Sequence, residues 1–182
     1  MRYNAQKKEP KMKWIFAVFW AGIEVFAAIA PFDTFQADFV QTVTDDTNKT
    51  ITYRGDITAL RPATARWHYT EPVEKTVFIS GHTVTVVEPE LEQAIIKEFR
   101  SDIDFFRILS RAEPIGKNRY LAAYEKRRFV IETEKDLPVS ITYKDDFDNR
   151  IRIVFSHRKI DVPLDPKSLE PKIPDDYDLL RE

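Results

Sequence analysis

The side chains that could do chemistry in this chain do not form a common catalytic pattern. The three histidines, His68, His82 and His157, are isolated and lack the spacing of a metal-binding helix. Ser80 and Gly81 read as a hairpin turn, without the flanking glycines of a Gly-x-Ser-x-Gly elbow. Cysteine is absent, which excludes disulfides, thiol nucleophiles and thiolate metal sites. The sequence therefore predicts a protein that is not an enzyme and uses no cofactor or metal.

The distribution of charged residues does not favour binding of calcium or of nucleic acid. The acidic segment 145–149 (Asp-Asp-Phe-Asp-Asn) lacks the central glycine and distal glutamate of an EF-hand loop, so we interpret it as a β-turn. The whole chain has 28 Lys and Arg against 30 Asp and Glu, a net charge of −2. Without a basic excess to neutralise a phosphate backbone, nucleic acid is not an expected partner.

Arg61 is the polar residue with the most unusual position. It follows Ile57 and Ala59 on the apolar side of an alternating segment, where a cation is costly unless it is paired or hydrogen-bonded. Alternatively, Arg61 is at the strand end and turns into solvent before Pro62. The spacing alone leaves both interpretations open.

The first 27 residues have the pattern of a cleavable secretory signal peptide. Five basic residues precede a short apolar run, and Val25-Phe26-Ala27 provides a plausible cleavage site after Ala27. The run is too short to span a membrane and is interrupted by Glu24. We therefore expect an exported protein of one domain, residues 28–182, with a net charge of −5 after cleavage.

Most of the remaining chain shows the two-residue alternation of half-buried strands. Ten segments have this pattern or are bounded by turn residues, namely 35–44, 51–59, 65–70, 76–79, 82–87, 93–98, 120–124, 127–133, 139–144 and 150–157. A sheet with so many strands curls, and its apolar face needs a cover. The proline-rich tail from Val162 to Glu182 is expected to pack along the surface.

One segment predicts a helix instead. Ser101 and Asp104 have the spacing of a capping box, and the following residues include Phe105, Phe106 and Leu109. We expect a helix of about three turns over residues 101–112 with a wide apolar face. A sheet wrapped around such a helix predicts a hollow for an apolar ligand, although periodicity does not distinguish an empty hollow from a filled core.

Several segments in sequence order resemble the LolA family of outer-membrane lipoprotein carriers. The opening Phe-x-Ala-x-Phe-x-Gln is at residues 35–41, and a Gly-led strand ending in Arg-Pro is at residues 55–62. Trp-x-Tyr-x-x-Pro follows at residues 67–72, and Glu-Pro-x-Leu-x-Gln-Ala at residues 88–94. Residues 104–109 resemble the branch of the family found in epsilonproteobacteria, and the likeness covers nearly all of 32–182.

The resemblance implies a mainly β fold with helices (α+β). The expected architecture is an incomplete antiparallel β-barrel, a half-barrel of about ten or eleven strands, capped by a helical lid over an apolar cavity. It also implies a lid latch at Arg61, because the matching arginine of the family bonds backbone groups of the lid and holds the empty carrier closed. The expected acyl-binding residues come from the inner face of the sheet and from the helix: Phe35, Phe39, Ile57, Trp67, Tyr69, Phe105, Phe106 and Leu109.

Function follows from the same resemblance. A monomer in the periplasm would take acylated lipoproteins from an inner-membrane ABC-type releasing complex. It would pass them to an outer-membrane receptor lipoprotein, or to the outer membrane directly. An alternative is a lipid-sensing half-barrel domain without a transport role. This chain departs from the family pattern in its short segment before residue 35 and in Ala65, where some relatives have an aromatic residue.

Overall fold

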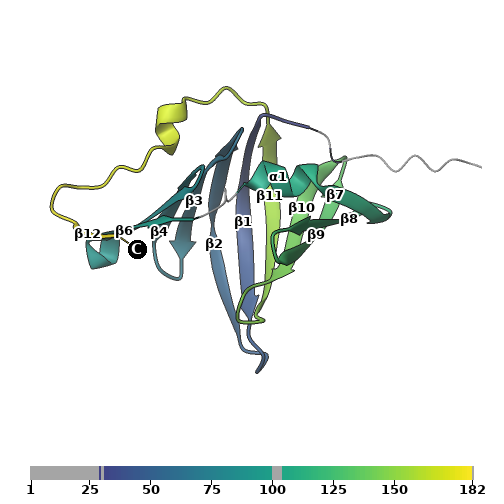
Figure 1. Cartoon of the computed structure of the whole chain (residues 1–182), viewed down its shortest axis with the longest axis horizontal. Coiled ribbons are helices and arrows are strands. Elements are labelled where there is room, and N and C mark those ends of the chain that lie inside the picture. Colours follow the sequence, from purple (N-terminus) through teal and green to yellow (C-terminus); the bar gives the residue numbers. More distant parts are fainter. Residues whose placement is uncertain (1–28, 30, 100–103, 182) are drawn as a thin grey trace, which may run out of the picture.

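Twelve strands form one sheet in the computed structural model, which describes residues 29, 31–99 and 104–181. The strand order is β12-β6-β5-β4-β3-β2-β1-β11-β10-β9-β8-β7. Neighbouring strands are antiparallel except β12 and β6, which are parallel. The predicted signal peptide, residues 1–27, lies outside the described residues. The fold is therefore mainly β, as predicted, and its sheet is open (Figure 1).

The strands are, in chain order, β1 (Thr34–Thr44), β2 (Thr50–Leu60), β3 (Thr64–Glu71), β4 (Lys75–Ser80), β5 (Thr83–Glu88), β6 (Gln93–Glu98), β7 (Ala112–Gly116), β8 (Arg119–Tyr124), β9 (Arg127–Glu134), β10 (Leu137–Lys144), β11 (Arg150–Ile160) and β12 (Asp178–Arg181). One α-helix, α1 (Phe105–Ser110), and two 3₁₀ turns, η1 (Pro89–Leu91) and η2 (Pro166–Leu169), complete the described elements.

All ten predicted strands are present, but the predicted number of ten or eleven is wrong because β7 and β12 were not foreseen. Strand β7 contains Pro114, which cannot donate a backbone hydrogen bond and is tolerated because β7 is at the edge of the sheet. Strand β12 has only four residues, and it forms by pairing with β6, about eighty residues away in the sequence. Neither strand has a strong local signal.

The predicted helix is also too long. Asp104 has an extended backbone and is the N-cap, with its side chain accepting a hydrogen bond from the Phe106 backbone N–H at 2.8 Å. Ser101 lies outside the described residues. At the other end, Ala112 begins β7 and pairs with Ala122 of β8. A six-residue helix has little stability of its own, so its length is set by the surrounding structure.

Aspartates define the two long hairpins of the sheet. Asp45 Oδ1 accepts hydrogen bonds from the backbone N–H groups of Thr47 and Lys49, at 2.9 and 2.8 Å. Asp145 Oδ1 makes the equivalent bonds with Phe147 and Asn149, at 2.9 and 3.0 Å. The interpretation of residues 145–149 as a β-turn is confirmed, because the carboxylate of Asp145 is used within the turn.

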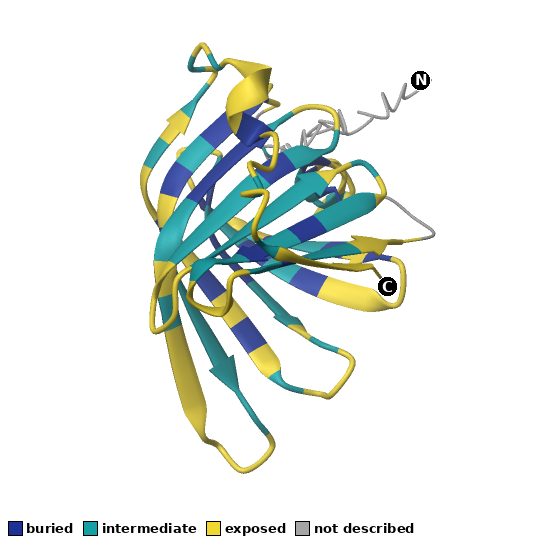
Figure 2. Ribbon diagram, turned by 90° about the vertical axis from the view of Figure 1, so that its left-hand side faces the viewer, coloured by how far each residue is buried: buried dark blue, intermediate teal, exposed yellow. Residues whose placement is uncertain are grey.

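The two faces of the sheet have different covers. Helix α1 lies on the face that carries the large apolar side chains, near β1, β11 and β8 (Figure 1). Figure 2 shows that burial is concentrated in the middle of the strands, whereas the hairpin ends are exposed. The tail crosses the opposite face, where η2 contacts β3 and buries Leu169. The tail is therefore part of the packed structure.

Candidate functional site

The first three strands place their apolar side chains in register on one face. Ala37 of β1 pairs with Ile57 of β2, which pairs with Trp67 of β3. Because successive side chains of a strand point to opposite faces, these residues and those two positions away form a continuous apolar surface. This surface is the inner face of the sheet, the face covered by α1.

Gly55 allows two aromatic rings to meet on this face. It lies between Phe39 and Tyr69 in the register, and their ring centroids are 5.1 Å apart. A Cβ atom at position 55 would collide with the backbone oxygen of His68. Glycine is therefore required here by close backbone approach, and the contact between Phe39 and Tyr69 depends on it.

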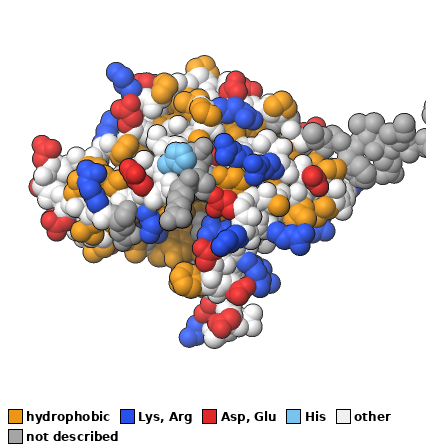
Figure 3. Space-filling view, viewed as in Figure 1, with side chains coloured by type: hydrophobic (Ala, Val, Ile, Leu, Met, Phe, Trp, Pro, Cys, Tyr) orange, Lys and Arg blue, Asp and Glu red, His pale blue; other side chains and the backbone are white. Residues whose placement is uncertain are grey.

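A pocket of about 840 Å³ opens on the inner face, between the sheet and α1. Apolar and aromatic side chains make up most of its wall, including Trp67, Tyr69, Val77, Ile79, Phe99, Phe105, Phe106, Ile108, Tyr124, Phe129, Ile141, Tyr143 and Ile153. Figure 3 shows hydrophobic side chains in a recess on this side of the molecule, surrounded by charged side chains. The volume is in the range of sites for small apolar ligands.

Helix α1 contributes two phenylalanines with different environments. The Phe105 ring is half-buried, lines the pocket and lies 5.2 Å from the ring of Phe35. The Phe106 ring is 1% exposed and lies 5.8 Å from that of Phe32. Aromatic contacts therefore hold the helix against the sheet and the chain before it.

The predicted acyl-binding residues fall into two groups. Four of them line the pocket: Trp67, Tyr69, Phe105 and Phe106. The other four, Phe35, Phe39, Ile57 and Leu109, are at most 6% exposed and belong to the packed core beneath. All eight are in one apolar cluster, but only the first group borders empty space in this structure.

The pocket also has a polar part that the sequence analysis missed. Arg127 at the start of β9 and Asp146 in the β10–β11 turn both line it and form a bidentate ion pair, Nε–Oδ1 3.3 Å and Nη2–Oδ2 2.7 Å. This hydrogen bond to Asp146 raises the pKa of Arg127. The sequence contained part of this information. Arg127 is two residues before Phe129 and four before Ile131, both buried, so the alternation places all three on one face of the strand.

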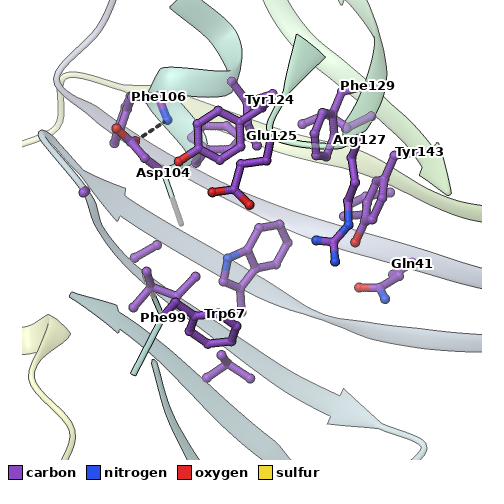
Figure 4. Close-up of a pocket in the computed structure, with 18 of the residues that line it drawn as sticks. Gln41, Trp67, Phe99, Asp104, Phe106, Tyr124, Glu125, Arg127, Phe129 and Tyr143 are labelled. Carbon is purple, nitrogen blue, oxygen red and sulfur yellow. Dashed lines mark hydrogen bonds between the residues drawn. The ribbon is translucent and has the colours of Figure 1, made fainter. Parts of the chain in front are cut away.

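Two tyrosines and a glutamine continue this polar part. The Tyr69 hydroxyl donates to Gln41 Oε1 at 3.1 Å. Burial raises the pKa of both Tyr69 and Tyr143, so both hydroxyls stay protonated at neutral pH. In Figure 4, Arg127, Tyr143 and Gln41 lie together at one end of the pocket, with Asp104 and Phe106 at the other.

Arg61 connects the chain before β1 to α1. Its Nε donates to the backbone oxygen of Phe32 at 2.8 Å and lies 3.6 Å from Asp33 Oδ1. Its guanidinium carbon is 4.8 Å from the centroid of the Phe106 ring, which is cation–π geometry. The side chain is 38% exposed, so Arg61 is paired and also reaches solvent.

The described residues contain no cluster of His, Asp or Glu able to hold a metal ion. Over the same residues, no helix has the length and apolar character needed to cross a membrane. His68 Nδ1 is 2.9 Å from Asp56 Oδ2, and His157 Nδ1 is 2.6 Å from Asp38 Oδ2. Both histidines thus contact a carboxylate of a neighbouring strand, and neither is among the residues that line the pocket.

Comparison with known proteins identifies the family of this chain. Residues 30–114 match the family model described as outer membrane lipoprotein carrier protein LolA. An outer-membrane lipoprotein carrier protein of Campylobacter jejuni is 31% identical over 171 residues, covering 93% of this chain and 100% of the relative. One from Wolinella succinogenes is 29% identical over 169 residues, covering 91% and 98%.

This chain therefore belongs to the LolA family of outer-membrane lipoprotein carrier proteins, and the predicted family is confirmed. Among solved structures, an uncharacterised conserved protein from Thermus thermophilus has the same fold. Its TM-score is 0.52 at 12% identity, covering 82% of this chain and 91% of that one.

Proposed function

We propose that this protein carries lipoproteins through the periplasm by holding their acyl chains in the pocket beneath α1. The observation that carries the proposal is the 840 Å³ pocket with its largely aromatic and aliphatic wall. Exposing an acyl chain to water costs roughly 0.8 kcal/mol per methylene, or on the order of 10 kcal/mol for one long chain. A carrier that covers such a chain removes most of this cost without any reaction.

In this proposal α1 is a lid and Arg61 is its latch. The helix has only six residues and no backbone pairing with the strands is part of its ladder, so its movement would leave the twelve-stranded sheet paired. Arg61 joins the lid residue Phe106 to the backbone of Phe32, next to the first strand. Entry of cargo would separate these groups, and release would restore them.

The route of transport extends the proposal. The cargo would come from an ABC-type complex in the inner membrane and pass to an outer-membrane receptor, or to the outer membrane itself. The protein would act as a monomer. It would be exported to the periplasm with its signal peptide removed after Ala27. Sequencing the N-terminus of the periplasmic protein tests the last point, and an uncleaved, membrane-bound product would contradict it.

The direct test of function is a binding titration followed by the fluorescence of Trp67, which lines the pocket and is the only tryptophan of residues 28–182. We expect a triacylated lipopeptide and a second one of unrelated peptide sequence to change the emission equally. The deacylated peptide should have no effect, because the pocket wall binds by burying apolar surface and does not contact the peptide specifically. Binding of the deacylated peptide, or of none of the three, would refute the proposal.

A further inference from the structure

Three polar side chains of the pocket gather at one end, whereas the carboxylate of Asp104 lies at the other. Arg127, Tyr143 and Gln41 form this group in Figure 4, and the Tyr69 hydroxyl is bonded to Gln41. Arg127 itself and its partner Asp146 are exposed, so this end faces solvent. The wall between it and α1 is mainly apolar, with Trp67, Ile141 and Ile153 among its residues. The end with Arg127, Tyr143 and Gln41 thus differs in character from this apolar wall.

Hydrogen-bond donors remain available at this end. Arg127 uses Nε and Nη2 on Asp146, and its Nη1 has no partner among the described residues. Gln41 accepts from Tyr69 through Oε1, which leaves its amide N–H groups to donate. The protonated Tyr143 hydroxyl is a third donor. A ligand that fits this end must therefore offer acceptors.

The charges at this end favour a neutral acceptor over an anion. Arg127 is already neutralised by the bidentate contact with Asp146. Glu125 and Lys126, which precede Arg127 in the chain and also line the pocket, carry opposite charges. A phosphate or carboxylate would meet no net positive field, whereas a carbonyl oxygen needs only the donors.

We propose that Arg127, Tyr143 and Gln41, the last held by the Tyr69 hydroxyl, form a carbonyl-binding end that recognises the ester and amide carbonyls linking acyl chains to a lipid-modified N-terminus. The acyl chains then point along the apolar wall towards α1. The attached polypeptide leaves the pocket past Glu125 and Asp146. This inference rests on the proposed function and adds to it a fixed orientation of the cargo.

The test compares a diacylglyceryl lipopeptide with its dialkyl ether analogue, which has the same chains and peptide but no ester carbonyls. The wild-type protein should bind the ester form about tenfold more tightly, the effect of one or two net hydrogen bonds. Arg127→Met should bring this ratio close to one, because only the ester form has carbonyl oxygens that lose a donor. Gln41→Leu, which keeps Arg127 and Asp146 paired, should lower the ratio as well.

The matched control is Arg152→Met. Arg152 of β11 also pairs with a carboxylate, Glu132, at 3.4 Å, but it does not line the pocket. It should keep the wild-type ratio, and circular dichroism should show all variants folded. Equal binding of ester and ether forms by the wild type, or an unchanged ratio in both Arg127→Met and Gln41→Leu, would overturn the inference. Failure of the wild type to bind either lipopeptide would instead refute the proposed function.

A second pair of ligands, diacylglycerol and dialkylglycerol without peptide, tests whether the recognised carbonyls are those of the glyceryl esters. Binding of the two is compared as for the lipopeptides. The same ester preference without the peptide supports binding of the glyceryl esters. If the ester preference is lost when the peptide is absent, the assignment to these esters is overturned.

Discussion

Replacing Arg61 by leucine tests whether the latch contacts control cargo binding. The change removes the hydrogen bond to Phe32, the cation–π contact with Phe106 and the ion pair with Asp33. A charge-assisted hydrogen bond contributes about 1.5–3 kcal/mol, a cation–π contact about 0.5–1, and an exposed ion pair about 0–1. Since the side chain is 38% exposed, we discount the total to about 2 kcal/mol, which is roughly 30-fold in an equilibrium constant.

These contacts stabilise the arrangement in which α1 is held to the chain before β1. If cargo entry breaks them, their loss shifts the equilibrium towards the cargo-bound state. Arg61→Leu should therefore bind a triacylated lipopeptide up to about 30-fold more tightly. It should also release the lipopeptide more slowly to acceptor vesicles. Both quantities follow from the Trp67 emission during titration and after mixing with vesicles.

Arg54→Leu provides the control for loss of an arginine on β2. Arg54 pairs with Glu71 at 3.2 Å and its side chain is 55% exposed, but it is not among the residues that line the pocket. This variant should bind and release like the wild type. If Arg61→Leu is also unchanged in both measurements, the latch reasoning is wrong and Arg61 has only a structural contact with Phe106.

Three further substitutions probe the scaffold. Gly55→Ala should lower the free energy of unfolding by about 3 kcal/mol or more, because the added Cβ collides with the backbone of His68; a normal urea midpoint would contradict this. Phe105→Ala should weaken lipopeptide binding about tenfold and cost only about 1–2 kcal/mol of stability, since the ring is half-buried; binding equal to wild type would place the cargo elsewhere. Hydrogen bonding from Ser140 lowers the pKa of Glu132, so the carboxylate stabilises the fold above its unfolded pKa of about 4.3 and loses this effect as the pH falls through the lowered value. Glu132→Gln should thus be less stable than wild type by under about 1 kcal/mol at pH 7, with no difference once the pH is below the lowered pKa, and a difference that persists there would exclude this origin.

The strands and their inner face were predictable because they depend on a local rule. Side chains alternate across a strand, so Phe35, Phe39, Ile57, Trp67 and Tyr69 had to share a face once their strands paired in register. The structure adds the partner strands that bury them, such as β11, whose Phe155 pairs with Phe39. A separation of more than one hundred residues leaves no local pattern for such a pairing.

Local signals failed where competing interactions decide the outcome. Ser101 and Asp104 fitted a capping box, but the fold places Asp104 in an extended conformation at the start of α1. Ala112 fitted the helical face, but pairing with β8 drew it into β7. The partner strand that pairs with Ala112 is present only in the assembled sheet, so a local helical pattern does not reveal it.

By itself the sequence determined the class of fold, the apolar surface and, through the order of its motifs, the LolA family. Tertiary structure decided which apolar residues fill the core and which border the pocket. Phe39 and Trp67 are on the same face with rings 5.2 Å apart, yet only Trp67 lines the pocket. It also brought Gln41, Arg127 and Asp146 to one end of the pocket from three separate segments. The reason is that empty space is a property of how elements pack against each other, and no spacing within one strand specifies it.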